Sequence, residues 1–444
     1  MFIELSPLSP RLKYVVIALV MAVLGIAAGL FASTFLGVST TLGKNIPAFH
    51  IASDYVAGVI TASCLFIVIF FLPIEMSTKK ALAALWVARS MVTLGFMLYY
   101  EYIYRLDAYN YYTWMQAGYK ELDWFLFDGT NTVISIGNML IKNFPFLNFY
   151  HALKVLFSFL GLIGALLFFR GYQEITGDKD PMTLYLIGLF PSSIFWSSIL
   201  GKDPIVFFLL SCFFYGTMLV CKKISIKALA LLIVGAIGLV FMRFWLAPVA
   251  TVSLLVAYNL AKSAKISTIK IAVGVLVVFG SVAFFSIAAE QFKILSFNDL
   301  IERIQTMSRS WGSGGSTTSV PVFTGLKDLV LYLPIGAFTA IFRPLPGDVM
   351  NLFGVVAGLE NLVLLVMYGI ALFSYKIEER RTPFMLYITT FIAIWGSLYA
   401  FISPQNLGTA SRFKLQILPL MLIYIQFVKF KKQQKTMQNE NNPT

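Results

Sequence analysis

The sequence predicts an all-α polytopic membrane protein, and three observations support this prediction. First, 58% of the 444 residues are hydrophobic and 12% are charged, whereas about a quarter of an average soluble domain is charged. Second, long apolar runs recur along the whole chain. Third, the short segments between alternate runs are basic. Together these properties exclude a soluble globular enzyme and a disordered protein.

About twelve segments are predicted to cross the bilayer, because a spanning helix needs roughly 20 mostly apolar residues. They are approximately 14–36, 54–73, 82–103, 152–169, 182–200, 204–221, 227–243, 246–261, 268–288, 352–375, 383–402 and 412–429. The first run follows a basic start and has no clear small-residue cleavage site, so we expect a membrane anchor.

The charges of the loops predict the orientation. With the N-terminus inside, every inner connection is short and basic, for example Lys79–Lys80 and Lys222–Lys223, and such segments stay in the cytoplasm. Both termini are therefore expected there. The formal net charge of +13 is then a topology signal, and nucleic acid is not an expected partner.

The chain is expected to divide into three parts. Residues 1–80 form an amino-terminal two-helix membrane addition, 81–430 a catalytic transmembrane core, and 431–444 a polar cytoplasmic tail. Two outer loops, 104–151 and 289–351, are long, so we look for chemistry on the outer face. Three scattered cysteines and two isolated histidines give neither a disulfide framework nor a metal centre with nitrogen and sulfur ligands.

The first long outer loop opens with Asp107, just past the end of a predicted membrane helix. A partly desolvated carboxylate there can accept a proton from a hydroxyl, and the neighbouring Arg105, Tyr109 and Tyr112 can hold a sugar. The alternative is a solvated acid within an interfacial aromatic belt. Residues 129–146 are expected to form a short interfacial helix.

A second carboxylate pair in this loop, Glu121 and Asp123, is a weak candidate for a divalent cation site. A solvated turn is the alternative. A divalent cation is therefore the one cofactor that the sequence suggests.

The fifth predicted span contains Pro191, which should bend it. The following turn holds Lys202 and Asp203 at the start of the next helix. Asp203 is expected to cap that helix and to face the positive end of its dipole. Lys202 has no such structural role and can bind a phosphate.

The second long outer loop has three predicted parts. Residues 296–307 form an amphipathic helix, in which Ser296 and Asp299 resemble a capping box. Residues 308–319 are rich in serine and glycine, as in a hinge or lid. The apolar stretch 326–343 is expected to be a re-entrant or outer-leaflet helix that ends at Arg343.

Several cations are predicted at one membrane level on the outer face. Arginine presents a planar fork that matches phosphate oxygens, so a cluster there suits a phosphate or pyrophosphate. Each member has an alternative interpretation as a snorkelling membrane anchor. The predicted set is Lys202, Arg243, Arg343, Arg412 and Lys414.

Two ionisable residues fall inside predicted membrane helices, Arg89 and Glu360. Such groups usually face a cavity or a partner. The sequence pairs them with nothing, so they could line a lipid groove or a translocation path.

These features resemble the GT-C superfamily of membrane glycosyltransferases, which use polyprenyl-phosphate-linked sugars as donors. The likeness covers most of residues 100–430. It is carried by Leu106-Asp107-Ala108-Tyr109-Asn110-Tyr111-Tyr112, by Lys202-Asp203 at a helix start, and by Ser411-Arg412-Phe413-Lys414 with Pro419. In that family the acid loop usually follows the first membrane helix, whereas here it follows the third.

The resemblance implies that Asp107 is the general base and that basic residues hold the leaving phosphate. The expected activity is transfer of a sugar or glycan from a polyprenyl-phosphate or polyprenyl-pyrophosphate donor to a glycan or lipid acceptor, in cell-surface polysaccharide or glycoconjugate assembly. We expect this transferase in a bacterial plasma membrane, with its active site on the periplasmic face.

Two alternatives remain open. A multi-pass transporter or flippase for lipid-linked sugars fits an even number of helices with both ends inside. A Wzy-like polymerase or ligase of different fold would depend more on Arg243, Arg343 and Arg412 than on Asp107.

Overall fold

The computed structural model describes residues 37–38, 41–118, 128–260, 296–311, 316–319, 322–374 and 382–441. Over these ranges the chain is helical, apart from one isolated bridge between Thr317 and Asn406. The prediction of an all-α protein is therefore confirmed. The predicted spans 14–36 and 268–288 lie outside the described residues.

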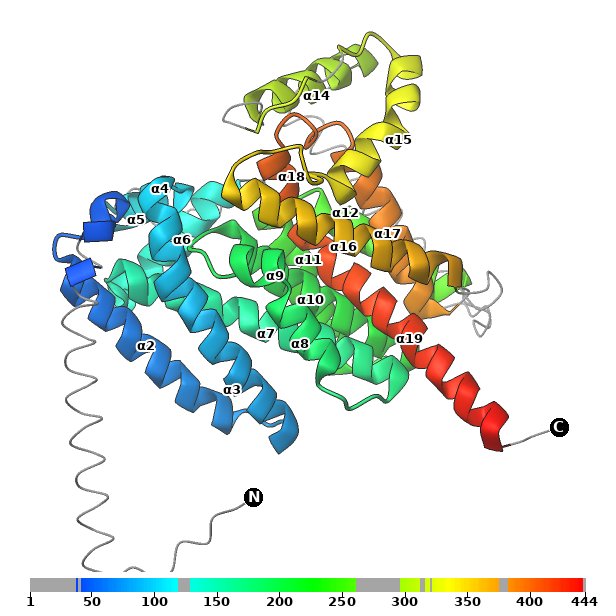
Figure 1. Cartoon of the computed structure of the whole chain (residues 1–444), viewed down its shortest axis with the longest axis horizontal. Helices are drawn as coiled ribbons and strands as arrows, with labels where there is room; N and C mark the ends of the chain where they lie inside the picture. Colours follow the sequence, from blue (N-terminus) through cyan, green and yellow to red (C-terminus); the bar gives the residue numbers. More distant parts are fainter. Residues whose placement is uncertain are drawn as a thin grey trace, which may run out of the picture.

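The helices follow one another with short connections (Figure 1). In chain order they are α2 (Ile51–Phe71), α3 (Met76–Met91), the π-helical η2 (Val92–Phe96), α4 (Met97–Ile103), α5 (Asp107–Gln116), α6 (Gly129–Asn143), α7 (Tyr150–Thr176), α8 (Met182–Leu189), α9 (Pro191–Trp196), α10 (Lys202–Lys222), α11 (Ile226–Arg243), α12 (Leu246–Leu260), α14 (Phe297–Trp311), α15 (Leu326–Phe342), α16 (Leu352–Ser374), α17 (Pro383–Tyr399), α18 (Leu407–Phe413) and α19 (Leu418–Asn441).

Two long helices form the centre of the bundle. In the most apolar stretches of α7 and α10, 72% and 78% of the residues are buried within the protein. The corresponding stretches of α2, α11 and α16 are only 28%, 28% and 33% buried. Helices that expose so much apolar surface need a nonpolar solvent, so the chain is an integral membrane protein.

Six described helical segments are long and apolar enough to cross a bilayer, or seven if the bent pair formed by α18 and α19 is one span. These are α2, the continuous α3–α4, α7, α10, α11 and α16. The predicted spans 246–261 and 383–402 correspond to the shorter apolar helices α12 and α17. The full count of twelve is therefore not confirmed over the described residues.

The predicted fifth span, 182–200, is broken. It consists of α8 and α9, which meet at Phe190–Pro191. Proline at the first position of α9 has no N–H to donate and prevents α8 from continuing. The predicted bend at Pro191 is thus confirmed, and it turns the chain toward the start of α10.

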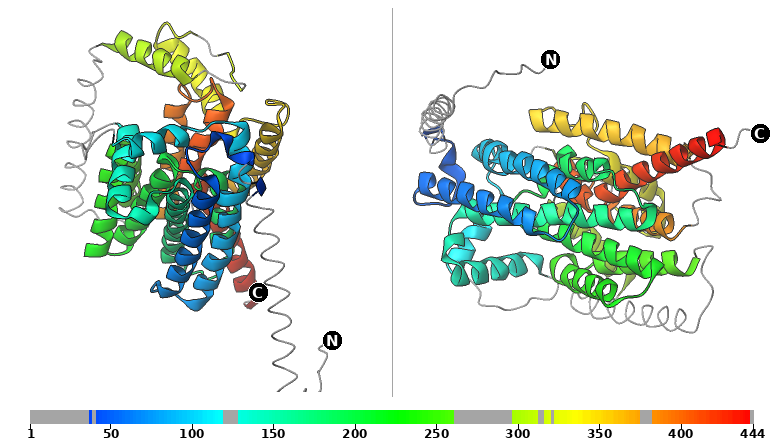
Figure 2. Two further views of the ribbon diagram at one scale, coloured as in Figure 1. Left: turned by 90° about the vertical axis from the view of Figure 1, so that its left-hand side faces the viewer. Right: turned by 90° about the horizontal axis from the view of Figure 1, so that it is seen from below.

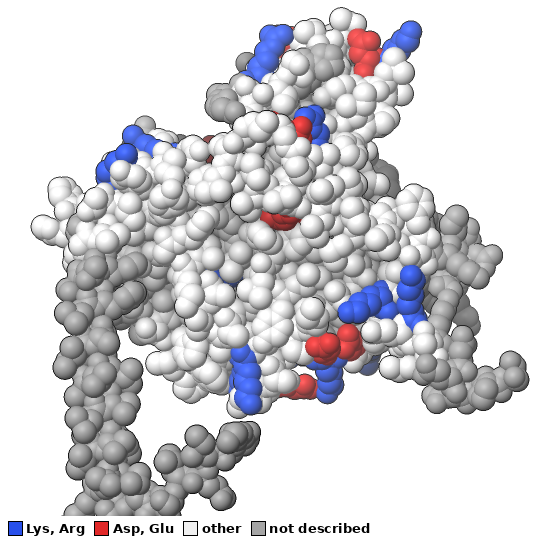
Figure 3. Space-filling view, in the orientation of Figure 1, with Lys and Arg blue, Asp and Glu red and all other residues white. Residues whose placement is uncertain are grey.

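Charged side chains gather near the two ends of the bundle, and a broad, largely uncharged band separates them on the face that Figure 3 shows. At one end, the connection before α3 meets the connection before α8 through a Glu75–Lys179 ion pair of 2.8 Å. At the opposite end lie the starts of α5, α6 and α10 together with α14 and α18 (Figures 1 and 2).

The helix that follows residue 296 confirms the predicted capping box. The Ser296 N–H donates to Asp299 Oδ2 at 2.7 Å, and the Asp299 N–H donates to Ser296 Oγ at 3.2 Å. Beyond α14, Ser316 accepts the Leu407 N–H on its backbone oxygen at 3.0 Å. The second long loop is therefore tied to the segment that leads into α18.

A buried polar cluster joins α2 to the central helix α7. Asp54 accepts the backbone N–H groups of Tyr150 and His151 at 2.7 and 2.8 Å. Lys154 of α7 pairs with Glu101 of α4 at 2.9 Å, with both side chains buried. The helices at both sides of the expected 80/81 boundary thus pack directly against the core.

Candidate functional site

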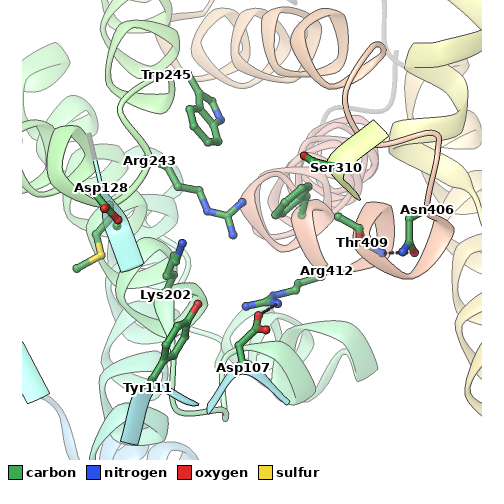
Figure 4. Close-up of a pocket in the computed structure, with 13 residues that line it drawn as sticks. Asp107, Tyr111, Asp128, Lys202, Arg243, Trp245, Ser310, Asn406, Thr409 and Arg412 are labelled. Atoms are coloured by element: carbon green, nitrogen blue, oxygen red, sulfur yellow. Dashed lines mark hydrogen bonds and ion pairs between the residues drawn. The ribbon is translucent and has the colours of Figure 1, made fainter. Parts of the chain in front are cut away.

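The described residues enclose a polar pocket of about 370 Å³ where α5, α6, α10, α11 and α18 converge at one end of the bundle (Figure 4). Four residues predicted for the site line it: Asp107, Lys202, Arg243 and Arg412. They come from four separate elements, so the fold brings together side chains that are about 300 residues apart. The other lining residues are Tyr111, Asp128, Gly129, Met242, Trp245, Ser310, Asn406, Thr409 and Phe413.

Asp203 lies behind the pocket and holds two arginines in place. Its Oδ1 accepts Arg243 Nη2 at 2.8 Å, and its Oδ2 accepts Arg412 Nε. Asp203 is 3% exposed. A buried carboxylate shared by two guanidinium groups keeps both cations fixed and compensated. The predicted capping role of Asp203 is wrong, because Gly201 occupies the cap position and no side chain caps α10.

Arg412 also reaches a second carboxylate. Its Nη1 lies 3.1 Å from Asp107 Oδ2, and the Asp107 side chain is 60% exposed. Such a solvent-exposed ion pair is weak, whereas the buried pair with Asp203 is not easily replaced. A ligand anion can therefore displace Asp107 from Arg412 without removing Arg412 from its position.

Two further donors face the same space. Figure 4 shows the ammonium group of Lys202 and the guanidinium group of Arg243 directed toward the middle of the pocket. Arg243 Nη1 is buried and has no hydrogen-bond partner among the described residues. Buried donors of this kind normally have a partner, so a ligand oxygen would complete the set.

Aromatic rings hold the two arginines from the side. The Arg243 guanidinium carbon lies 4.3 Å from the centre of the Phe413 ring, and that of Arg412 lies 5.7 Å from the centre of the Trp196 ring. These cation–π contacts restrict the guanidinium planes. Asp203 and one aromatic ring thus hold each arginine in place.

Tyr111 supplies a neutral hydroxyl to the pocket floor. It is buried, and burial together with the nearby Asp107 carboxylate raises the pKa of its phenol to about 12. The phenol therefore stays protonated at physiological pH and can donate a hydrogen bond to a ligand.

The opposite wall of the pocket begins α6. Asp128 caps this helix by accepting the N–H groups of Thr130 and Asn131 at 3.0 and 3.1 Å. The helix starts against α11: a Cβ added to Gly129 would lie 2.2 Å from the backbone oxygen of Met242. Only glycine permits this approach, which places Asp128 beside the residues that precede Arg243.

Three predicted loop residues do not line the pocket. Arg105 stacks on Tyr109, with its guanidinium carbon 3.9 Å from the ring centre, and it donates to Asn110 at 3.0 Å. Tyr112 is 1% exposed and packs against Tyr150. The rotation of α5 explains this, because Asp107 and Tyr111 are four residues apart on the pocket face and Tyr112 faces the bundle.

Two predicted cations also lie elsewhere. Arg343 makes a two-pronged ion pair with Asp348, at 2.8 and 2.6 Å, in the connection between α15 and α16. Lys414 is completely buried and donates to Asn361. The predicted five-cation cluster therefore reduces to Lys202, Arg243 and Arg412 in the pocket.

The structure also shows what surrounds the two membrane-embedded charges. Arg89 donates to the Oγ of Ser197 at 2.7 Å and to that of Ser198 at 3.3 Å, and Glu360 accepts the Ser192 N–H at 2.9 Å. Both therefore contact the broken segment around α9. They do not line the pocket.

The weak metal candidates Glu121 and Asp123 lie outside the described residues. Within the described ranges, no group of three or more His, Cys, Asp and Glu side chains is arranged to hold a metal ion.

Sequence reasoning missed several lining residues, including Tyr111, Asp128 and Asn406. Asp128 had a usable signal, because an aspartate directly before the predicted helix at 129 is a typical cap. Ser310 and Asn406 had none, because only the contact between the second long loop and the α18 segment brings them to the pocket.

Comparisons with family models, with curated protein sequences and with solved structures found no match for the chain.

Proposed function

We propose that the protein is a membrane glycosyltransferase that moves a sugar or glycan from a polyprenyl-phosphate or polyprenyl-pyrophosphate donor to a glycan or lipid acceptor. One observation carries the proposal: Arg412 connects the buried Asp203 to the exposed Asp107 in a pocket that Lys202 and Arg243 also line. This supplies a phosphate site and a proton acceptor side by side.

The cations suit the leaving group. Three cations in the pocket face the carboxylates of Asp107, Asp128 and Asp203, so the charges balance without ligand. The donor phosphate accepts hydrogen bonds from the Nη1 groups of Arg412 and Arg243 and from the ammonium group of Lys202. In this site the fixed cations stabilise the charge that develops on the phosphate.

Asp107 is freed when the phosphate occupies Arg412. In the transfer step, the bond between the sugar anomeric carbon and the phosphate oxygen breaks, and the acceptor hydroxyl oxygen forms the new bond to that carbon. The hydroxyl proton passes to Asp107, and the bonding electrons leave with the phosphate. General-base catalysis of this kind contributes about 10²- to 10⁴-fold to a rate.

In the proposed topology, the pocket faces the outer, periplasmic side of a bacterial plasma membrane. Both termini are cytoplasmic, and about twelve helices cross the bilayer. Basic residues at the end of the bundle opposite the pocket support this orientation, among them Lys179 and Lys222, which pair with Glu75 and Glu174.

A flippase for lipid-linked sugars is the second candidate. Two buried ionisable side chains favour it, Glu360 beside Ser192 and Lys414 beside Asn361, because ionisable groups inside membrane helices often mark a transport path. A polymerase or ligase of different fold is a further alternative; it would use Arg243 and Arg412 without Arg343, which does not line the pocket.

Reconstitution distinguishes a transferase from a flippase. The purified protein is placed in liposomes with a labelled polyprenyl-phosphate sugar and a soluble acceptor analogue, and both glycosidic product and movement of the donor between leaflets are measured. We expect glycosidic product that depends on Arg412. Arg412→Gln should form no product, whereas the control Arg170→Gln, near the end of α7 remote from the pocket, should form as much product as the wild type. Donor movement without product would contradict the proposal.

A further inference from the structure

A row of aromatic side chains lies at the contact between α4, α9 and α16. We call it the aromatic wall and define it as Phe96, Tyr100, Tyr104, Phe195 and Phe353. Tyr100 is at its centre, with ring-centre distances of 5.0 Å to Phe195, 4.7 Å to Phe353 and 5.1 Å to Tyr104. Phe96 lies 5.9 Å from both phenylalanines. Five aromatic rings in mutual contact would normally be buried; here the wall faces outward.

The wall is open to the surroundings of the bundle. Phe96 and Tyr104 are 46% and 39% exposed, and the other three rings are half-buried. The surface beside it on α16 is apolar as well, with Val355, Val356 and Leu359 exposed. Because α4 and α16 belong to candidate spans, the exposed rings face the hydrocarbon of the bilayer.

The helix geometry produces this row. Phe96, Tyr100 and Tyr104 follow one another at intervals of four residues, so they share one helix face. The π-helical segment η2 ends at Phe96, precedes Tyr100 and Tyr104, and shifts the register relative to α3. Arg89 of α3 is buried in the bundle, while the rings of Phe96 and Tyr104 are exposed. Such π segments are frequent at functional sites.

The wall is continuous with the candidate site. Phe195 contacts Trp196 at 4.8 Å, and Trp196 supports the guanidinium group of Arg412. Tyr100 also lies within electrostatic range of Arg412. An unbroken line of aromatic contacts therefore runs from the cationic pocket to the membrane-facing surface.

From this continuity, we propose that the aromatic wall binds the isoprenoid chain of the polyprenyl-phosphate donor while its phosphate occupies the pocket. This assignment rests on the proposed function. The cationic end of the path takes an anion, and the apolar end takes hydrocarbon, so one amphiphile with an anionic head fits both ends.

The dimensions of the wall favour a single chain. The three rings on α4 and η2 form a row one residue wide, whereas a phospholipid would present two chains. From Phe96 to Tyr104 the row is about 12 Å long at 1.5 Å per residue, close to the roughly 15 Å depth of one leaflet. The wall thus guides the first part of one chain through the outer leaflet.

Photolabelling tests this inference without any transfer reaction. The full-length protein in lipid nanodiscs is exposed to a long-chain polyprenyl phosphate that carries a photoreactive group in its first isoprene units. A phosphatidic acid with the same group in one acyl chain is the comparison probe. Labelled peptides are mapped by mass spectrometry, in the wild type and in Phe96→Ala, Phe353→Ala and Phe373→Ala.

We expect the isoprenoid probe to label α4 and the first turns of α16, and the phosphatidic acid to label lipid-facing helices evenly. Phe96→Ala and Phe353→Ala should each lower the isoprenoid labelling about tenfold. Phe373→Ala should not, because Phe373 is 93% exposed near the far end of the same helix. Since Phe96 is already half exposed, its replacement leaves the bundle packing intact.

Even labelling by the isoprenoid probe would overturn the inference, as would equal labelling by the two probes or an equal loss in Phe373→Ala. These outcomes are separate from the proposed function. Wall labelling in a protein that forms no glycosidic product would refute the transferase alone, and even labelling in a protein that forms product would refute the wall alone.

Discussion

Asp107 and Asp203 contact the same arginine but differ sharply in burial. Asp203 is buried between Arg243 and Arg412, whereas the Asp107 side chain is 60% exposed. A buried carboxylate that compensates two guanidinium groups is required for the structure. An exposed one at the pocket wall is available for chemistry. The two aspartates should therefore respond differently to the same substitution.

Asp203→Asn should lower both stability and transfer. The change keeps the side-chain volume but leaves two guanidinium groups without their shared charge, and breaking a buried ion pair costs about 3–5 kcal/mol. Thermal denaturation in detergent should show a clearly lower midpoint temperature for this variant, whereas the midpoint of Asp107→Asn should equal that of the wild type. A wild-type midpoint for Asp203→Asn would refute the role assigned to this carboxylate.

At the residue scale the sequence identified four of the charged pocket residues, because a charged residue that directly flanks a long apolar run must lie near the membrane surface. The sequence did not show that other residues predicted for the site lie away from the pocket. Tyr112 is buried, Arg343 is paired with Asp348, and Lys414 is buried and donates to Asn361 of α16. These outcomes depend on helix rotation and on partners distant in sequence, which a single sequence does not encode locally.

The close approach of α6 to α11 sets the width of the pocket. Gly129 begins α6 against the backbone of Met242, the residue before Arg243. The contact is backbone to backbone, so no side chain can move away to make room. A larger residue must separate the two helices.

Gly129→Ala is expected to impair transfer. The added Cβ would move α6 from α11, and a displacement of about 1 Å at a catalytic site can cost roughly 10²-fold in rate. Gly369→Ala is the matched control, because nothing lies within 4 Å of the added Cβ in α16. Transfer assays and melting curves of both variants test this, and equal rates would contradict the proposed contact.

The connection between α15 and α16 is held by Arg343 and Asp348. Hydrogen bonding to Arg343 lowers the pKa of Asp348 below its usual value. A carboxyl with a lowered pKa in the folded state stabilises the protein above its unfolded pKa of about 3.9. That stabilisation is lost as the pH falls through the folded pKa.

Asp348→Asn should therefore lower the melting midpoint near neutral pH by an amount equivalent to about 1 kcal/mol, since the pair is partly exposed and screened. The difference between variant and wild type should begin to shrink as the pH falls below about 4, because the carboxyl is protonated first in the unfolded state and, at lower pH, in the folded state as well. Melting curves measured from pH 6 to pH 3 test this. A difference that stays constant over that range would show that the ion pair does not contribute.

Elements were predicted well where long apolar runs define them. The bounds of α10, α11 and α15 agree closely with the predicted segments, whereas α7 continues to Thr176, well beyond its predicted end at 169. The sequence did not predict the π-helical η2 or the bend of 58° between α18 and α19. η2 has no local pattern such as the proline that breaks α8 from α9, whereas the bend falls directly before Pro419, the second residue of α19.

At the scale of the whole molecule, the pocket and the most basic connections lie at opposite ends of the bundle. In the proposed topology, the positive-inside tendency orients the pocket outward. This arrangement would give the site access to lipid-linked substrates in the outer leaflet and to acceptors outside the cell.

Cysteine labelling tests this orientation. In a background without Cys64, Cys212 and Cys221, an impermeant maleimide should label Asn298→Cys in intact cells, because α14 lies at the pocket end. Lys223→Cys, at the end of α10 remote from the pocket, should be labelled only after permeabilisation. The reverse pattern would invert the proposed topology.

The central claim is that Asp107 takes a proton from the acceptor hydroxyl. Its most direct test compares sugar transfer from a polyprenyl-phosphate donor by the wild type, Asp107→Asn and Glu302→Gln, an exposed acid on α14 that does not line the pocket. The account predicts a loss of about 10²-fold or more for Asp107→Asn, an unchanged melting midpoint, and wild-type transfer for Glu302→Gln. Undiminished transfer by a well-folded Asp107→Asn would contradict it.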